Sequence, residues 1–449
     1  MPVFICFIYL VLLVIIKYKI KDIISRFCLY CFTSYWSISL IVSWINPYGM
    51  QENENHTYIL LVLGMVSFIV GMLSFVRFSS VKTYKVNKHS LLSSITYVVR
   101  SKILLILYIG CAVFAAKYAS NALIAAELSG GALIDESRGE MIFENSSIAK
   151  LIYYYIVDPL YFITLSIISL VILSKQKHRL FIITAIVFLI GSIILGGGRS
   201  KFVIILMYIV FGYVCYNNNF TNLFKFKIIW KSIVLLLIMT IAMSFQTGYR
   251  STGSYQFNSD SLTDGILDMG ETFATYSIIP IRLFDYSLRN DYVSKFGGEK
   301  YGRATIAGVD EIACGILRRI SGIKVKSTID IVNYTQDHPV NIIPGKHPYN
   351  YCYTGLFYFY MDFGVFGIIF IPFLLGFVYR YYIFQFYKYN SLISFIIISL
   401  GFFMMMHSLF QNYFVKNWIL PICVILAVIQ YIFVTKKCKF SLARNIKIA

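Results

Sequence analysis

Eleven long apolar stretches recur along this chain of 449 residues and constrain its fold more than any other feature. A helix that crosses the hydrocarbon core of a bilayer needs about 20 predominantly apolar residues. Hydrophobic residues make up 58% of the chain and charged residues only 14%, too few to cover a surface that faces water. The pattern therefore predicts an all-α, polytopic bundle of transmembrane helices. The stretches lie at 2–18, 27–46, 58–77, 103–124, 148–173, 180–196, 202–217, 230–247, 363–385, 391–408 and 418–435.

Basic residues gather in alternate connections between these stretches. They lie in 17–26, 77–102, 175–179 and 225–231, at Arg380 and Lys388, and in the tail from Lys436 to Lys447. This set holds 23 basic residues and one acid, Asp22, whereas the rest of the chain holds 17 basic and 20 acidic residues. The positive-inside rule places the basic set in the cytoplasm. Eleven spans then put the N-terminus outside and the C-terminus inside, and the net charge of +19 reflects topology rather than nucleic-acid binding.

The chain divides into three parts. Residues 1–247 hold the first eight spans with short loops, 248–350 form a large external segment, and 351–449 hold the last three spans and the basic tail. The external segment carries 11 basic and 11 acidic residues that are interspersed, unlike a disordered tail of one sign. We expect a partly helical cap on the membrane surface, with one helix that Asp260 or Ser261 caps. Helical spacing predicts a second, amphipathic helix through Ile306, Val309, Ile312, Ile316 and Ile320.

The first candidate for chemistry is the turn Gly196-Gly197-Gly198-Arg199-Ser200-Lys201 between two predicted spans. Glycines let the backbone approach a ligand closely, and the N–H groups at the start of the next helix form an anion site. The Arg199 guanidinium offers a planar fork for phosphate oxygens. The alternative is a tight hairpin whose arginine reaches to the membrane surface.

Arginines of the external segment are the second set of candidates. Arg250 follows the eighth span directly, so that helix sets its distance from the bilayer. Several arginines that converge at the membrane surface suit a diphosphate. Each of them alone is also typical of a solvated or salt-bridged surface residue. The others are Arg282, Arg289, Arg303, Arg318 and Arg319.

The third set lies where the external segment returns to the membrane. His347 can act as a base near neutral pH, and Tyr349 follows it in His347-Pro348-Tyr349-Asn350. Asp362 lies near the outer end of the ninth predicted span, where acids are uncommon without a role. The many tyrosines here also fit an interfacial aromatic belt. Asp158, inside the fifth span, is either structural or a site residue.

Several kinds of chemistry lack their sequence motifs. No two aspartates are separated by one residue, so the metal-binding motif of nucleotide-sugar transferases is missing. The six histidines show no metal-ligand clustering, and no nucleotide-binding loop lies on the cytoplasmic side. We therefore expect no metal and no cofactor, and a donor that is already activated outside the cytoplasm.

In the order of these features the chain resembles the Wzy-type polymerases of bacterial O-antigen, within the wider group that includes O-antigen ligases. A Gly-Gly-Arg-Ser turn (Gly197 to Ser200) precedes a large loop that opens with Tyr249-Arg250. The loop closes with His347-Pro348, and an aromatic-x-Asp-Phe-Gly-x-x-Gly run follows from Tyr360 to Gly367. The resemblance covers roughly 103–410. An Arg-x10-Gly pattern of some members is absent, and many members have an even number of spans, which would make twelve here.

The resemblance implies a glycosyltransferase of the bacterial inner membrane that takes part in lipopolysaccharide biosynthesis. Its donor and acceptor would both be oligosaccharide repeats linked to undecaprenyl diphosphate, and a chain-length regulator is a further partner. Arg199 and Arg250 would bind the diphosphate, with Arg282 or Arg303 as a third cation. Gly197, Gly198, Ser200 and Tyr349 would contact substrate. His347 would be the base, and Asp362 would orient it or the sugar.

Two other functions remain open at this stage. An O-antigen ligase would use the same cations and base, and the sequence separates it poorly from a polymerase. A flippase for lipid-linked oligosaccharides usually has two related halves and ionisable residues along the middle of its spans. Here the ionisable residues are biased to the outer ends of spans and to the external segment, and no two halves correspond, which favours an enzyme.

Overall fold

The computed structural model describes residues 1–75, 85–128, 142–143, 146–174, 178–196, 200–220, 275, 277–323, 325–342, 353–416 and 418–431. Within these ranges the chain is helical, and no strand forms. Six of the described helices are long and apolar enough to cross a membrane, and four shorter apolar helices accompany them. The chain is therefore a polytopic helical membrane protein, as its apolar stretches predict.

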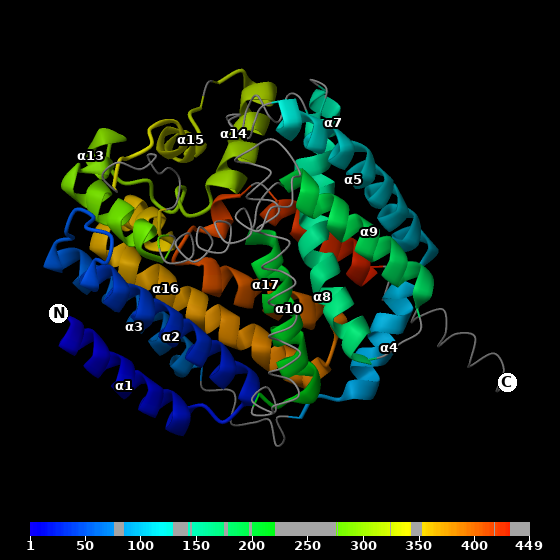
Figure 1. Ribbon diagram of the computed structural model, residues 1–449, viewed down its shortest axis with the longest axis horizontal. Coiled ribbons are helices and arrows are strands. Elements are labelled where there is room, and N and C mark those ends of the chain that lie inside the picture. The colour runs from blue at the N-terminus through cyan, green and yellow to red at the C-terminus, as the bar shows by residue number, and fades with distance from the viewer. Residues whose placement is uncertain are drawn as a thin grey trace, which may run out of the picture.

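The bundle is built from two groups of long helices (Figure 1). In the first group α1 packs on α2, α2 on α3, and α3 on α16. In the second group α5 packs on α9, and α8 packs on both α9 and α10. Helix α17 contacts α16, α8 and α10 and so joins the two groups. The bounds are α1 Pro2–Lys19, α2 Ile23–Ile45, α3 Asn55–Ser74, α5 Lys102–Leu128, α8 Asp158–Ser174, α9 Arg179–Gly196, α10 Ser200–Asn217, α16 Gly355–Tyr389, α17 Leu392–His407 and a last helix, Ile419–Tyr431.

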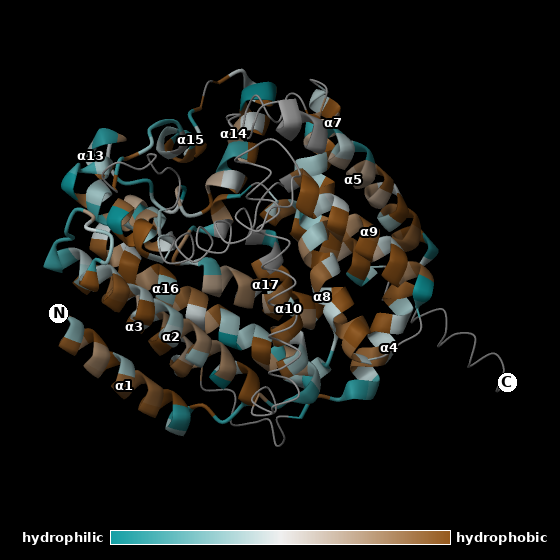
Figure 2. Cartoon of the chain, in the orientation of Figure 1, coloured by the Kyte–Doolittle hydropathy of each residue, from teal (hydrophilic) through white to brown (hydrophobic). Residues whose placement is uncertain are grey.

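The described part of the external segment is also helical, as expected. Residues 277–289 form a helix, and three shorter elements follow it: α13 (Tyr292–Lys295), α14 (Ala307–Ser321) and α15 (Ile329–Asp337). They gather at one end of the bundle, where Figure 2 shows polar residues above the apolar spans. Helix α14 confirms the amphipathic helix that the isoleucine spacing predicts. The helix expected after Asp260 and the span expected at 230–247 lie outside the described residues.

Three elements differ from the prediction. Residues 88–99, expected as part of a loop, form α4 (Lys88–Val99), which buries Leu91, Ile95 and Val98 against α8 and α17. The fifth span is α7 (Ser147–Ile152), a π-helical turn η2 (Tyr153–Val157) and α8 in succession. Helix α16 begins at Gly355, before the predicted start at 363, because its first turns are buried inside the protein rather than in lipid.

Glycines set the distance between α3 and α16. A Cβ atom at Gly376 would lie 2.2 Å from the carbonyl oxygen of Phe68, and one at Gly71 would lie 2.0 Å from that of Phe373. Real Cβ atoms essentially never come so close to a carbonyl oxygen, so these positions need glycine. Small residues let membrane helices approach closely and pack without a hydrophobic driving force.

We predict that Gly376→Val separates α3 from α16 and costs about 3 kcal/mol or more, as overpacking of a tight contact does. The matched control is Gly110→Val in α5, where a Cβ atom would meet nothing within 4 Å. The midpoint of heat-induced aggregation of the detergent-purified protein should fall clearly for the first variant and stay unchanged for the second. Equal aggregation midpoints for the two variants would contradict the claim that Gly376 sets the distance between α3 and α16.

Candidate functional site

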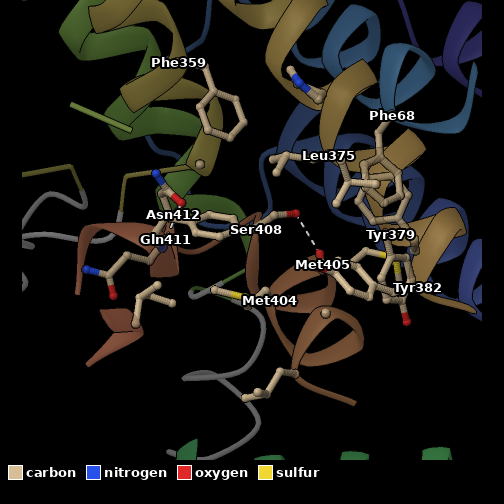
Figure 3. A pocket seen from close by; sticks show the side chains of 18 of the residues that line it. Phe68, Phe359, Leu375, Tyr379, Tyr382, Met404, Met405, Ser408, Gln411 and Asn412 are labelled. Atoms are coloured by element: carbon tan, nitrogen blue, oxygen red, sulfur yellow. Dashed lines mark hydrogen bonds between the residues drawn. The ribbon is translucent and has the colours of Figure 1, made fainter. Parts of the chain in front are cut away.

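An apolar cavity of about 360 Å³ lies inside the bundle and is the candidate site. Helices α2, α3, α16, α17 and the last helix line it (Figure 3), and none of its lining residues is charged. Ligand cavities of this kind are apolar with a few polar groups that fix the orientation of the ligand. The apolar walls include Phe68, Leu375, Tyr379, Leu400, Met404 and Ile422.

Two lining residues of the cavity are exposed. Val378 of α16 is 40% exposed, and Cys423 of the last helix is exposed as well. Both residues belong to apolar helices, so an apolar molecule is the kind of ligand that suits this side of the cavity.

One end of the cavity is polar. Gln411 and Asn412 lie there, on the opposite side of the view from Tyr379 and Tyr382, and Ser408 lies between the two sides (Figure 3). Ser408 accepts a hydrogen bond from the Trp36 indole N–H at 3.3 Å and donates to the Met405 carbonyl. Gln411 is only 8% exposed, and its amide nitrogen has no partner among the described residues. A buried donor without a partner costs free energy, so a polar ligand group at this position would gain a hydrogen bond.

The external segment is attached directly above this polar end. Asn412 donates from Nδ2 to the Thr305 carbonyl at 2.7 Å. Asp362 is fully buried, and its two carboxylate oxygens accept from the backbone N–H groups of Ala304 (2.8 Å) and Thr305 (2.7 Å). The turn at 299–306 is therefore held from both sides, by α16 and by the end of α17. Asn412, which follows α17 and lines the cavity, is the contact by which this turn covers the cavity's polar end, and the turn is called the roof below.

A break in α16 makes this attachment possible. Phe363 and Gly364 leave the helical conformation, and Gly364 has a φ of +56°, which favours glycine. The carbonyls of Met361 and Asp362 accept instead from the N–H groups of Lys300 and Tyr301, at 3.0 and 3.1 Å. The Asp-Phe-Gly-x-x-Gly run thus has a structural explanation. Its last glycine, Gly367, is needed because a Cβ atom there would lie 2.0 Å from the Phe359 carbonyl oxygen.

Arg282 is engaged inside the protein rather than aimed at an open site. It is buried, and it donates to two carbonyls. One belongs to Ser43 in the last turn of α2, and the other to Gln51 in the connection between α2 and α3. Asp285, one turn later, accepts from Glu54 N and the Thr57 hydroxyl. The helix at 277–289 is therefore held against the C-terminal end of α2 and the N-terminal end of α3. This geometry favours a structural role for Arg282 over the predicted contact with diphosphate.

Arg303 has a similar role within the external segment. Its Nε donates to Asp310 at 2.8 Å, and its Nη2 donates to the second carboxylate oxygen and to the Lys326 carbonyl. The Asp310 hydrogen bond raises the pKa of Arg303. Burial opposes ionisation of Asp310, but its hydrogen bonds from Arg303 and Thr328 outweigh that effect and hold its pKa below the ordinary value. The pair ties α14 to the residues on both sides of it, which again favours a structural role.

The remaining predicted site residues are mostly beyond the described ranges. Gly197, Gly198, Arg199, Arg250, His347 and Tyr349 lie outside them, so their roles stay predictions. Ser200 is described as the first residue of α10, and α9 ends at Gly196. The interpretation of the connection between them, as an anion site or as a tight hairpin, stays a prediction.

Sequence reasoning missed two features beside these elements. Lys201 Nζ lies 3.7 Å from Asp158 Oδ1, donates to the Ser192 carbonyl at 2.8 Å and sits over the Tyr161 ring. Asp158 thus has a partner on another helix, which its sequence neighbours do not reveal. Gln411 and Asn412 were missed because two polar residues between apolar helices look like an ordinary connection.

Comparisons with known proteins returned no relative: no family model, no curated protein and no solved structure matches this chain.

The Arg303–Asp310 pair makes the order of the external segment dependent on pH. Because Asp310 titrates below its unfolded value of about 3.9, its contribution is present above that pH and is lost as the pH falls through the folded pKa. We predict that Asp310→Asn loosens residues 299–330 at pH 7 by about 2 kcal/mol, the scale of a hydrogen bond to a charged group.

Limited proteolysis measures this effect. Trypsin at pH 7 should cleave between 299 and 330 faster in the variant than in the wild type, whereas pepsin at about pH 2 should cleave both at closer rates. Asp330→Asn changes an exposed aspartate of α15 and serves as the control. If the cleavage rates of the wild type and the variant differed by the same factor at both pH values, the Arg303–Asp310 pair would not be the cause of the difference.

Proposed function

We propose that this protein is a glycosyltransferase that joins oligosaccharide repeats linked to undecaprenyl diphosphate, as Wzy-type O-antigen polymerases do. The observation that carries the proposal is the apolar cavity with one polar end under an external roof. A substrate with a long isoprenoid chain and a polar head needs such a site, with its chain among the spans and its head at the outer surface. The reaction then takes place where the external segment meets the bundle.

The chemistry of the transfer assigns roles to the predicted residues. The acceptor hydroxyl attacks the anomeric carbon of the donor, the bond from that carbon to the diphosphate breaks, and the lipid diphosphate leaves with the electron pair. Arg199 and Arg250 stabilise the negative charge that develops on the diphosphate. His347 takes the proton of the acceptor hydroxyl. Neither a metal nor a cofactor takes part in this scheme.

The described residues have supporting roles in this proposal. Arg282 and Arg303 hold the external segment in place instead of contacting diphosphate, because two nitrogens of each guanidinium already donate to protein oxygens. Asp362 holds the roof through Ala304 and Thr305 rather than orienting a base. Gln411 offers its amide to the polar head of the lipid at the cavity's end.

The proposal includes a topology. The chain crosses the bacterial inner membrane eleven times, with a periplasmic N-terminus and a cytoplasmic C-terminus. The distribution of basic residues supports this orientation. Two observations agree with it: the external helices gather at one end of the bundle, and Arg380 and Asp22 form a buried ion pair that joins α16 to the start of α2. A chain-length regulator is a proposed partner.

The test deletes the gene from the cells that carry it, restores it in wild-type or variant form, and separates their lipopolysaccharide by length. Without the gene we expect a single repeat on the lipid core instead of a ladder. Met404→Trp, which adds bulk inside the cavity, should give the same loss, whereas Met406→Trp on a neighbouring position that does not line the cavity should keep the ladder. Immunoblots of the membranes verify that both variants are present in equal amounts.

Other outcomes separate the alternatives. Complete loss of polymer from the lipid core in the deletion strain would identify a ligase. An unchanged ladder in that strain would remove the polymerase proposal altogether. A normal ladder with Met404→Trp would show that the cavity does not serve the lipid substrate.

A further inference from the structure

Helix α14 has two halves with different surroundings. Its first half is fixed to the bundle: a Cβ atom at Gly308 would lie 2.5 Å from the backbone of Lys416, so the helix packs against the chain just before the last helix. Asp310, in the same turn, is held by Arg303 and Thr328. Beyond the buried Cys314, every residue from Ile316 to Ile323 is exposed. The second half of α14 therefore projects from the protein.

The projecting half carries large apolar side chains. Ile320 is 81% exposed and Ile323 is 62% exposed, and Ile316 and Leu317 are each half exposed. A turn at Gly322, with a φ of +70° and its N–H bonded to the Arg318 carbonyl, ends the helix and presents Ile323 after it. Four exposed aliphatic side chains within eight residues form a patch that water alone does not suit. Such a patch is typical of a surface that contacts a membrane or another protein.

The charge around the patch is of one sign. Arg318 and Arg319 lie in the exposed last turn of α14, and Lys324 and Lys326 follow it in the sequence. No aspartate or glutamate occurs between Glu311 and Asp330. A helix with aliphatic residues on one side and arginines and lysines beside them is typical of a segment that lies in the headgroup region of an anionic membrane.

The position of α14 brings this patch to the membrane boundary. Glu311 lies within electrostatic range of Tyr155 in η2, near the outer end of the fifth span. Figure 1 shows α14 at the same end of the bundle as α7, the first turns of that span. Two exposed residues of α7, Ile148 and Leu151, are apolar as well. The patch thus belongs to a helix that lies at the same end of the bundle as the start of the fifth span.

We propose that residues 316–323 dock on the outer leaflet of the membrane, with the aliphatic side chains among the acyl chains and the guanidinium groups of Arg318 and Arg319 at anionic phospholipid headgroups. This contact holds the external segment against the bilayer at a second point, away from the roof at 299–306. This membrane contact is independent of the proposed glycosyltransferase activity.

A fluorescent amino acid at position 320 tests the proposal on the full chain. Amber suppression places a dansyl side chain at Ile320 in one variant and at Asn333, an exposed residue of α15, in the control. Both proteins are reconstituted in vesicles of phosphatidylglycerol and phosphatidylethanolamine whose acyl chains carry bromine, which quenches on contact. We expect position 320 to lose most of its emission and position 333 to keep it, with iodide in water giving the reverse order.

Two further arms test the role of charge and the identity of the occupant. Replacing phosphatidylglycerol by phosphatidylcholine, or Arg318 and Arg319 by glutamate, should reduce the quenching at position 320 severalfold. Equal quenching in both kinds of vesicle would overturn the anionic part of the proposal. Strong iodide quenching at position 320 would show a patch in water, and shielding from both quenchers would show a protein partner or a second copy. Either result would overturn the proposal.

Discussion

The hydrogen bonds of the Asp362 carboxylate are the interaction that fixes the external segment on the helix bundle. This carboxylate is fully buried within an apolar helix, and it accepts two backbone hydrogen bonds from a turn 57 and 58 residues earlier in the chain. Burying a carboxylate is costly unless donors compensate its charge. The turn at 299–306 provides N–H donors both for this carboxylate and for the two carbonyls that the break in α16 leaves free. These matched hydrogen bonds fix the position of the external segment over the bundle.

Further polar ties make that position unique. Arg282 and Asp285 bind the outer end of α2 and α3, and Asn412 binds the same turn that Asp362 holds. These contacts join elements that also border the cavity. In the proposed function, this arrangement holds the polar head of the substrate close to residues of the external segment while its lipid chain stays in the bundle. Arg282 and Arg303, which the sequence offered as cations for a diphosphate, instead hydrogen-bond to oxygens of the protein.

The spans were predictable because an apolar stretch of about 20 residues needs no partner to be recognised. The helix α14 was predictable for the same reason, since its isoleucines repeat with the period of a helix. The amphipathic α4 was missed because it is shorter than a span and its serines divide its apolar residues. The role of Asp362 was beyond sequence reasoning because its partners, Ala304 and Thr305, contribute only backbone N–H groups. Gln411 was missed because the sequence does not show that its side chain is buried, nor that its amide nitrogen has no hydrogen-bond partner among the described residues.

Hydrogen–deuterium exchange of the peptide that covers 299–306 tests the role of Asp362 most directly. In the wild-type protein the amides of Ala304 and Thr305 should exchange slowly. In Asp362→Asn they should exchange at least about tenfold faster, the effect of losing about 1.4 kcal/mol of local protection, while the peptides of α3 and α8 stay unchanged. Unaltered exchange at 299–306 in this variant would contradict the claim that the carboxylate holds the external segment on the bundle.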